Sequence, residues 1–160
     1  MNINIQNCLV APIQGDSYWF GPDLYTFKMV EANTGQTAIL LEGLIQPQSG
    51  IPLHIHHYQE EYFYIIEGKF QFQLDREIVI ATAGKVIHSP QEQVHQYINI
   101  GSTAAKLLIW QTPAGFENFL AEIAIKAANP LESSPPANLP DLERIIVIGR
   151  KHGITIFKDY

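Results

Sequence analysis

The chain has one cysteine and few basic residues, and each shortage excludes a class of protein. Cys8 cannot form a disulfide within the chain, and a zinc site built from cysteines is likewise excluded. The 160 residues contain 10 Lys and Arg against 16 Asp and Glu, which gives a net charge of −6. Because nucleic-acid surfaces need clustered Lys and Arg, we expect no nucleic-acid partner.

Long hydrophobic runs are also lacking. No apolar stretch approaches the roughly 18 residues of a membrane-spanning helix. The first ten residues lack both the basic and the long apolar region of a signal peptide. We therefore expect a cytoplasmic protein without a membrane partner, and the 46% hydrophobic composition is sufficient for one compact domain.

Short strand-like segments separated by turns make up residues 19–111. Residues 37–45 are rich in aliphatic side chains, and residues 69–74 alternate apolar and polar side chains. Residues 77–81 follow a two-residue turn, so this pair predicts a hairpin. Three further strand-like segments follow, over residues 85–89, 95–100 and 105–110. Many short strands at this spacing are typical of an all-β sandwich or barrel.

The pattern changes after a Pro-Ala-Gly break. Residues 116–128 carry apolar side chains at helical spacing, and residues 140–153 predict a second helix that begins near a proline and ends at a glycine. Residues 129–140 hold four prolines, so we expect a stiff connection between the helices. Residues 154–157 are too few for an assignment.

In the stretch PLHIHHYQEEYFYIIEG, three histidines and the pair Glu60 and Glu61 stand in front of aromatic and aliphatic residues. On a helix, His54, His57 and Glu61 would share one face. On a strand, His54 and His56 would share a face, roughly 7 Å apart. The residues that follow, 62–66, all favour strands, so we prefer the strand interpretation.

This interpretation sets a geometric condition for Glu61. His57 would point away from the other two histidines, and Glu61 differs from them in parity along the strand. Residues 57–60 must therefore bend so that Glu61 faces inward, together with Phe63 and Ile65. Glu60 would then face outward.

If the chain bends in this way, two imidazoles and one carboxylate form a candidate site for a divalent transition metal. The alternative is a polar strand edge that holds no metal. His88 and His95 are further donors, but sequence spacing alone does not bring either of them to Glu61.

Two motifs in this sequence resemble the two motifs of the cupin superfamily. The first, HxHx4Ex6G, is matched by His54, His56, Glu61 and Gly68. The second, Gx5PxGxxHx3N, is matched by Gly84, Pro90, His95 and Asn99. The segments GFENFLAEI and PDLERIIVIGRKHGI further resemble bacterial single-domain cupins of the quercetin-dioxygenase type.

The resemblance implies an all-β fold, a double-stranded β-helix or jelly-roll barrel with a C-terminal α-helical appendage. We assign the barrel to residues 1–115 and a helical extension packed on it to residues 116–160. The implied cofactor is one divalent transition metal, Fe, Ni, Mn, Cu or Zn. Its implied ligands are His54, His56, Glu61 and His95.

The implied activity is that of a metal-dependent dioxygenase acting on a flavonol, an enol or a similar small oxygenated molecule, with Glu61 as the catalytic base. The alternatives are a non-catalytic cupin that binds a small molecule, such as a sugar-like ligand, and a cupin isomerase or decarboxylase. We expect a homodimer, because incompletely closed barrels leave strand edges exposed.

Several other residues are candidates for the surroundings of the metal. The candidates for the cavity wall are Phe63, His88, Tyr97 and Trp110, and each has an ordinary core or strand position as its alternative. Asn99 is a candidate to support a ligand or to tie down its strand, and His57 should face solvent.

Two turns depart from the family pattern. Glu92 replaces the glycine of the second motif, and Gln48 replaces a glycine expected beside Pro47, where Gly50 could serve the same turn.

Overall fold

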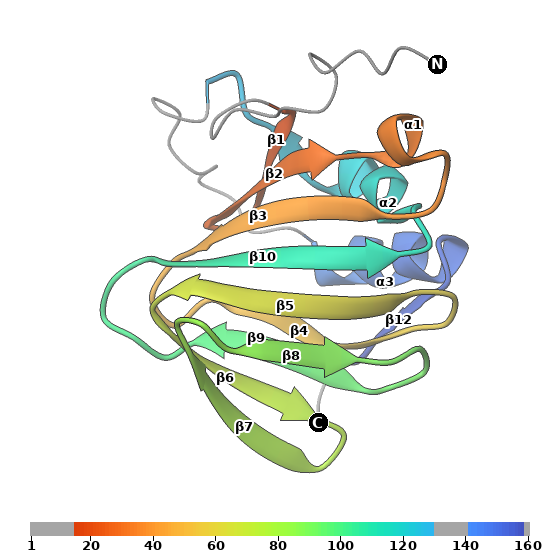
Figure 1. The fold of residues 1–160 in the computed structure, drawn as a ribbon. Helices are drawn as coiled ribbons and strands as arrows, with labels where there is room; N and C mark the ends of the chain where they lie inside the picture. Colours follow the sequence, from red (N-terminus) through yellow and green to blue (C-terminus); the bar gives the residue numbers. More distant parts are fainter. Residues whose placement is uncertain (1–14, 130–140, 159–160) are drawn as a thin grey trace, which may run out of the picture.

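The computed structural model describes residues 15–129 and 141–158 (Figure 1). Two antiparallel β-sheets form the body of the protein. Cys8 and the N-terminal residues that bear on a signal peptide lie outside the described residues. The same holds for nearly all of the predicted proline-rich connection. Within the described part of the chain, no helix has the length and apolar composition needed to cross a membrane.

The larger sheet has seven strands in the order β11-β1-β2-β3-β10-β5-β8. Their bounds are β1 Ser17–Phe20, β2 Asp23–Met29, β3 Ile39–Ile45, β5 Glu60–Glu67, β8 Val86–Ser89, β10 Ala105–Thr112 and β11 Ile125–Lys126. The smaller sheet has five strands in the order β12-β4-β9-β6-β7. Their bounds are β4 Gly50–His56, β6 Lys69–Leu74, β7 Glu77–Thr82, β9 His95–Asn99 and β12 Ile154–Ile156. The predicted all-β jelly roll is confirmed.

The predicted hairpin is confirmed in β6 and β7, which pair from Leu74 and Glu77 outward across a two-residue turn. Alternation along β6 buries Phe70 and Phe72 completely, whereas the intervening Gln71 is only partly buried. The pattern that predicted the strand therefore also determines which face of it enters the core.

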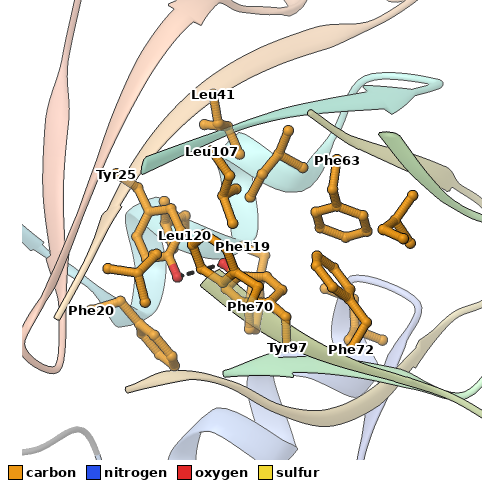
Figure 2. Packing of buried hydrophobic residues seen from close by; sticks show 14 of the residues in the cluster. Phe20, Tyr25, Leu41, Phe63, Phe70, Phe72, Tyr97, Leu107, Phe119 and Leu120 are labelled. Carbon is orange, nitrogen blue, oxygen red and sulfur yellow. Dashed lines mark hydrogen bonds between the residues drawn. The ribbon is translucent and has the colours of Figure 1, made fainter. Parts of the chain in front are cut away.

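Aromatic side chains fill the space between the two sheets (Figure 2). Phe63 of β5 packs against Phe72 and Tyr97 of the facing sheet, with ring centroids 5.2 and 5.6 Å apart. The hydroxyl groups of Tyr25 and Tyr97 form a hydrogen bond of 2.8 Å, which satisfies both buried phenols at once. This core holds the two sheets at a fixed separation, and the site described below lies beside it.

The segment after β10 contributes helices and strands to the fold. Helix α2 spans Phe116–Ile123 and α3 spans Leu142–Lys151, while a short α1 spans Glu31–Thr34 near the N-terminus. The second predicted helix is confirmed within two residues at each end. Asp141 caps it, because its side chain accepts a hydrogen bond from the Glu143 N–H.

The first predicted helix is shorter than expected. Residue Ala124 adopts an extended conformation, and β11 then pairs with β1 instead of continuing the helix. At the other end of the segment, β12 pairs with β4. The C-terminal segment therefore adds a strand to each sheet.

Candidate metal centre

Four buried side chains converge between the sheets, and one ligand atom from each lies within 4.8 Å of the others. His54 and His56 project from β4, and His95 stands opposite His54 at the start of β9. Glu61 reaches the same point from β5 in the other sheet. All four are at most 6% exposed. The structure thus brings together the four residues that the two motifs single out.

The bend required for Glu61 is present. Strand β4 ends at His56 and β5 begins at Glu60, so residues 57–59 interrupt the strand and reset its parity. As a result, Glu61 and Phe63 face inward, while Glu60 faces outward.

Backbone carbonyls fix which nitrogen of two imidazoles faces the centre. The Nδ1–H of His54 donates to the Pro52 carbonyl at 2.9 Å, and that of His95 donates to the Gln93 carbonyl at 3.0 Å. In the neutral imidazole the other nitrogen, Nε2, then carries a lone pair. Both Nε2 atoms therefore face the centre as metal-ligand atoms, with backbone partners behind them.

The distances between these atoms call for a shared cation or an extra proton. His95 Nε2 lies 2.8 Å from Glu61 Oε2, and His54 Nε2 lies 3.1 Å from His56 Nε2. His95 already donates from Nδ1, so its neutral form has no second proton for the carboxylate. A divalent cation among the four atoms satisfies both close pairs, and the donor set of three imidazoles and one carboxylate fits a transition metal.

Burial and charge set the protonation states of these groups. Burial lowers the pKa of His54 well below its usual value, and the neighbouring imidazoles lower it further. Burial also lowers the pKa of His56. Burial raises the pKa of Glu61, but the neighbouring imidazoles of His56 and His95 outweigh it, so that pKa falls to about 2. Neutral imidazoles beside an ionised carboxylate are the forms that bind metal.

Gln111 is a site residue that the sequence reasoning missed. It is fully buried on β10, directly across from Glu61. Its side-chain N–H donates to Glu61 Oε1 at 3.1 Å and lies 3.4 Å from His56 Nδ1. The available signal was a polar residue directly after the apolar run of residues 107–110.

A cavity of about 40 Å³ lies beside the four side chains, and His54, His56 and Glu61 form part of its wall. Phe63 and Tyr97 line it, as predicted. The C-terminal segment closes one side of the cavity with Phe116, Phe119, Leu120, Ile145, Ile154 and Ile156. We call these six residues the C-terminal wall. A group bound at the centre therefore meets a largely apolar chamber.

Two predicted cavity residues lie elsewhere. Trp110 is 42% exposed, because alternation along β10 turns Ile109 and Gln111 inward instead. His88 also lies on the outer face of the larger sheet, where its Nε2 is 2.9 Å from a Glu60 carboxylate oxygen and its ring stacks on Tyr62. The prediction that Trp110 and His88 line the cavity is wrong.

The side-chain hydrogen bonds of Asn99 go to loops and strand ends, away from the four converging side chains. Its side-chain N–H groups donate to the carbonyls of Ile45 and Thr103, and its Oδ1 accepts from the Gly101 N–H. The residue stands at the end of β9 away from His95. Of its two predicted roles, tying down the strand is the one supported.

The two departures from the motif glycines keep the conformation that a glycine would take. Glu92 has φ of 67° and Gln48 has φ of 60°. The Glu92 carboxylate also contacts His57 Nδ1 at 2.9 Å, which places His57 outside the centre. Gly50 has a different role from the turn we expected, since a Cβ there would lie 1.9 Å from the Tyr97 carbonyl oxygen.

Comparisons with known proteins agree with this architecture. Residues 41–111 match the family model described as the cupin domain. Polyketide synthase CurC from Streptomyces cyaneus is 26% identical over 108 residues, which cover 67% of this chain and 70% of that protein. Quercetin 2,3-dioxygenase from Bacillus subtilis is 27% identical over 106 residues, which cover 66% of this chain and 31% of that protein.

A solved structure from Thermotoga maritima, described as a predicted oxalate decarboxylase, has the same fold. It matches with a TM-score of 0.62 at 18% identity, over 66% of this chain and 98% of that one. At this identity, the likeness concerns the fold alone.

Proposed function

We propose that the protein is a metal-dependent dioxygenase of the quercetinase type, since residues 41–111 match the cupin-domain model. Its substrate would be a flavonol or another enol, with dioxygen as the second substrate. The observation that carries the proposal is the cavity, which shares His54, His56 and Glu61 with the candidate metal centre. The similarity to quercetin 2,3-dioxygenase supports it, although the matched residues cover under a third of that protein.

His54, His56, Glu61 and His95 would hold one divalent transition ion, Fe, Ni, Mn, Cu or Zn. The ion would act as a Lewis acid that lowers the pKa of a bound hydroxyl or enol.

Glu61 would accept the proton that the enol loses. Among the described residues, Glu61 is the only one that contributes a carboxylate to the cavity wall. The Gln111 side-chain N–H donates to its Oε1. Glu61 would take this role when its carboxylate loosens from the ion that it helps to hold. The apolar side chains around it would exclude water from the reacting centre.

The proposal also includes a cytoplasmic location and a homodimer, both of which we expect from the sequence.

The alternative is a cupin that binds a small molecule without catalysis, or an isomerase or decarboxylase on the same scaffold. The predicted oxalate decarboxylase has the same fold, so the fold does not choose between these activities. Consumption of dioxygen distinguishes the proposal from all of them.

The test measures bound metal by elemental analysis and oxygen uptake with flavonols and β-diketones. We expect His95→Ala to lose most of the metal and all oxygen uptake, because it removes one of four ligand atoms. The matched control is His57→Ala, whose imidazole contacts Glu92 and Thr155 outside the centre and should leave metal content unchanged. Equal metal content in His95→Ala and wild type would refute the ligand assignment. Metal-loaded protein that consumes no oxygen with any of these compounds would refute the dioxygenase.

A further inference from the structure

We propose that the C-terminal wall restricts this site to small, uncharged enols and β-dicarbonyl compounds, and excludes both three-ring flavonols and carboxylate or phosphate substrates. This inference rests on the proposed dioxygenase activity; of the substrates proposed above, it keeps the small enols and drops the flavonols. Its basis is the size of the cavity and the chemistry of its lining.

The size of the cavity limits the substrate first. Its volume is about 40 Å³, whereas pockets that enclose drug-sized ligands measure roughly 300–1,000 Å³. A flavonol carries three rings, so it would need Phe63, Phe119 or Ile145 to leave its packed position. These three side chains are at most 5% exposed and belong to the main core. Because such packing resists displacement, the cavity favours a compact molecule of a few carbon atoms.

The lining also lacks a cationic side chain that could pair with an anionic group. Among the described residues, no Lys or Arg contributes to the cavity wall. The hydroxyl groups of Tyr25 and Tyr97 share one hydrogen bond, which uses one of their two O–H hydrogens and offers only neutral donors to a ligand. A carboxylate or phosphate brought into this wall would lose its hydration without a charged hydrogen-bond partner, which is costly.

Cations on the nearby helix are turned away from the cavity. Lys151 of α3 contacts the Glu122 carboxylate, and Arg144 donates to the Glu122 carbonyl. Ile145 lies beside Arg144 in sequence, yet it is 5% exposed and lines the cavity. The apolar face of α3 is therefore the one presented to a ligand.

The charge of the loaded centre matches a monoanionic enolate. A divalent ion with three neutral imidazoles and one carboxylate has a net charge of about +1. An enol that passes its proton to Glu61 keeps this net charge at about +1, whereas a dianion such as oxalate would change it to about −1 within an apolar chamber.

The test uses Zn(II)-loaded protein and titration calorimetry with four probes: acetylacetone, the longer dipropionylmethane, quercetin and oxalate. We expect acetylacetone to bind at least about tenfold more tightly than quercetin or oxalate, and more tightly than dipropionylmethane. Tight binding of oxalate or quercetin to the wild type, or binding of none of the four probes, would overturn the inference.

Variants of α3 test the wall directly. Ile145→Ala should strengthen dipropionylmethane binding about tenfold, because it makes room for two further carbon atoms. Val147→Ala is the matched control on the same helix, since Val147 is 65% exposed and should leave all affinities unchanged. Ile145→Val is a milder variant that should act in the same direction if the alanine variant does not fold. Unchanged affinity in a folded Ile145 variant would overturn the role of the wall.

These readouts are independent of turnover. Selective binding of acetylacetone without oxygen uptake would refute the dioxygenase and leave the substrate class standing. Oxygen uptake with quercetin would support the dioxygenase and refute the proposed substrate class.

Discussion

Asp23 contributes to the free energy of unfolding, and this contribution should fall as the pH rises. The carboxyl group is 1% exposed at the start of β2. Its Oδ1 accepts from the Gln46 N–H at 2.8 Å and its Oδ2 from the Ser49 hydroxyl at 2.7 Å. Burial raises its pKa from 3.8 to about 6, although both hydrogen bonds act in the opposite direction.

The sign and the size of the effect follow from linkage. Between pH 3.8 and about 6 the unfolded chain has released this proton and the folded chain still holds it. Stability from Asp23 is therefore present below pH 3.8 and is lost as the pH rises through about 6. A pKa difference of about 2 corresponds to roughly 3 kcal/mol of unfolding free energy.

The replacement Asp23→Asn removes the titration and keeps the shape. The amide oxygen can still accept from the Gln46 N–H, and the amide N–H can donate to the Ser49 hydroxyl oxygen. We expect the variant to gain about 3 kcal/mol relative to wild type between pH 3.5 and 7.5.

The assay is urea unfolding followed by circular dichroism at a series of pH values. The difference between variant and wild type removes the contributions of all other groups. Ser49→Ala in the wild-type background should shift the loss of stability to higher pH, because the Asp23 carboxylate loses a hydrogen-bond donor. A difference between Asp23→Asn and wild type that stays constant with pH would refute the reasoning.

Two further predictions concern the backbone near the site. Glu92→Gly should be more stable than Glu92→Ala by about 1 kcal/mol in denaturant unfolding, because both lose the carboxylate but only glycine relieves the φ of 67°; equal stabilities would contradict this. Gly50→Ala should cost roughly 3 kcal/mol or more, or prevent folding, because its Cβ would lie 1.9 Å from the Tyr97 carbonyl oxygen. The control Gly43→Ala should be milder in the same denaturant-unfolding assay, since its nearest neighbour is the end of the Ile45 side chain at 3.2 Å.

Parity along the strands predicted the inward direction of the first cluster. His54 and His56 lie on one face of β4, and the polar link after them resets the register for Glu61. These features depend on local backbone geometry, which the sequence determines directly. His95 was available only through the motif resemblance, because its approach to Glu61 depends on how two sheets pack.

Where strand patterns are ambiguous, sequence reasoning was wrong or silent. The sequence AKLLIWQT is apolar at successive positions, so alternation does not say whether Ile109 or Trp110 faces inward. Gln111 becomes recognisable as a site residue only when β10 pairs with β5, which places it opposite Glu61. In the C-terminal segment, apolar side chains keep helical spacing past Ile123. The chain nevertheless leaves the helix there, because the next residues pair with β1.

The three-residue strand β12 could not be assigned alone, because only its partner β4 defines it as a strand. Ile154 pairs with His56 and Ile156 pairs with His54. The alignment of the two histidines thus depends on contacts made far away in the sequence.

The order of the chain has a consequence for how the protein is made. His54, His56, Glu61 and His95 all precede the six residues of the C-terminal wall. All four ligand side chains therefore leave the ribosome before any residue of that wall does. Metal insertion during synthesis would meet an open site, whereas insertion into the finished protein would have to pass a packed hydrophobic layer. The time at which the cell supplies the metal can thus influence which ion the protein retains.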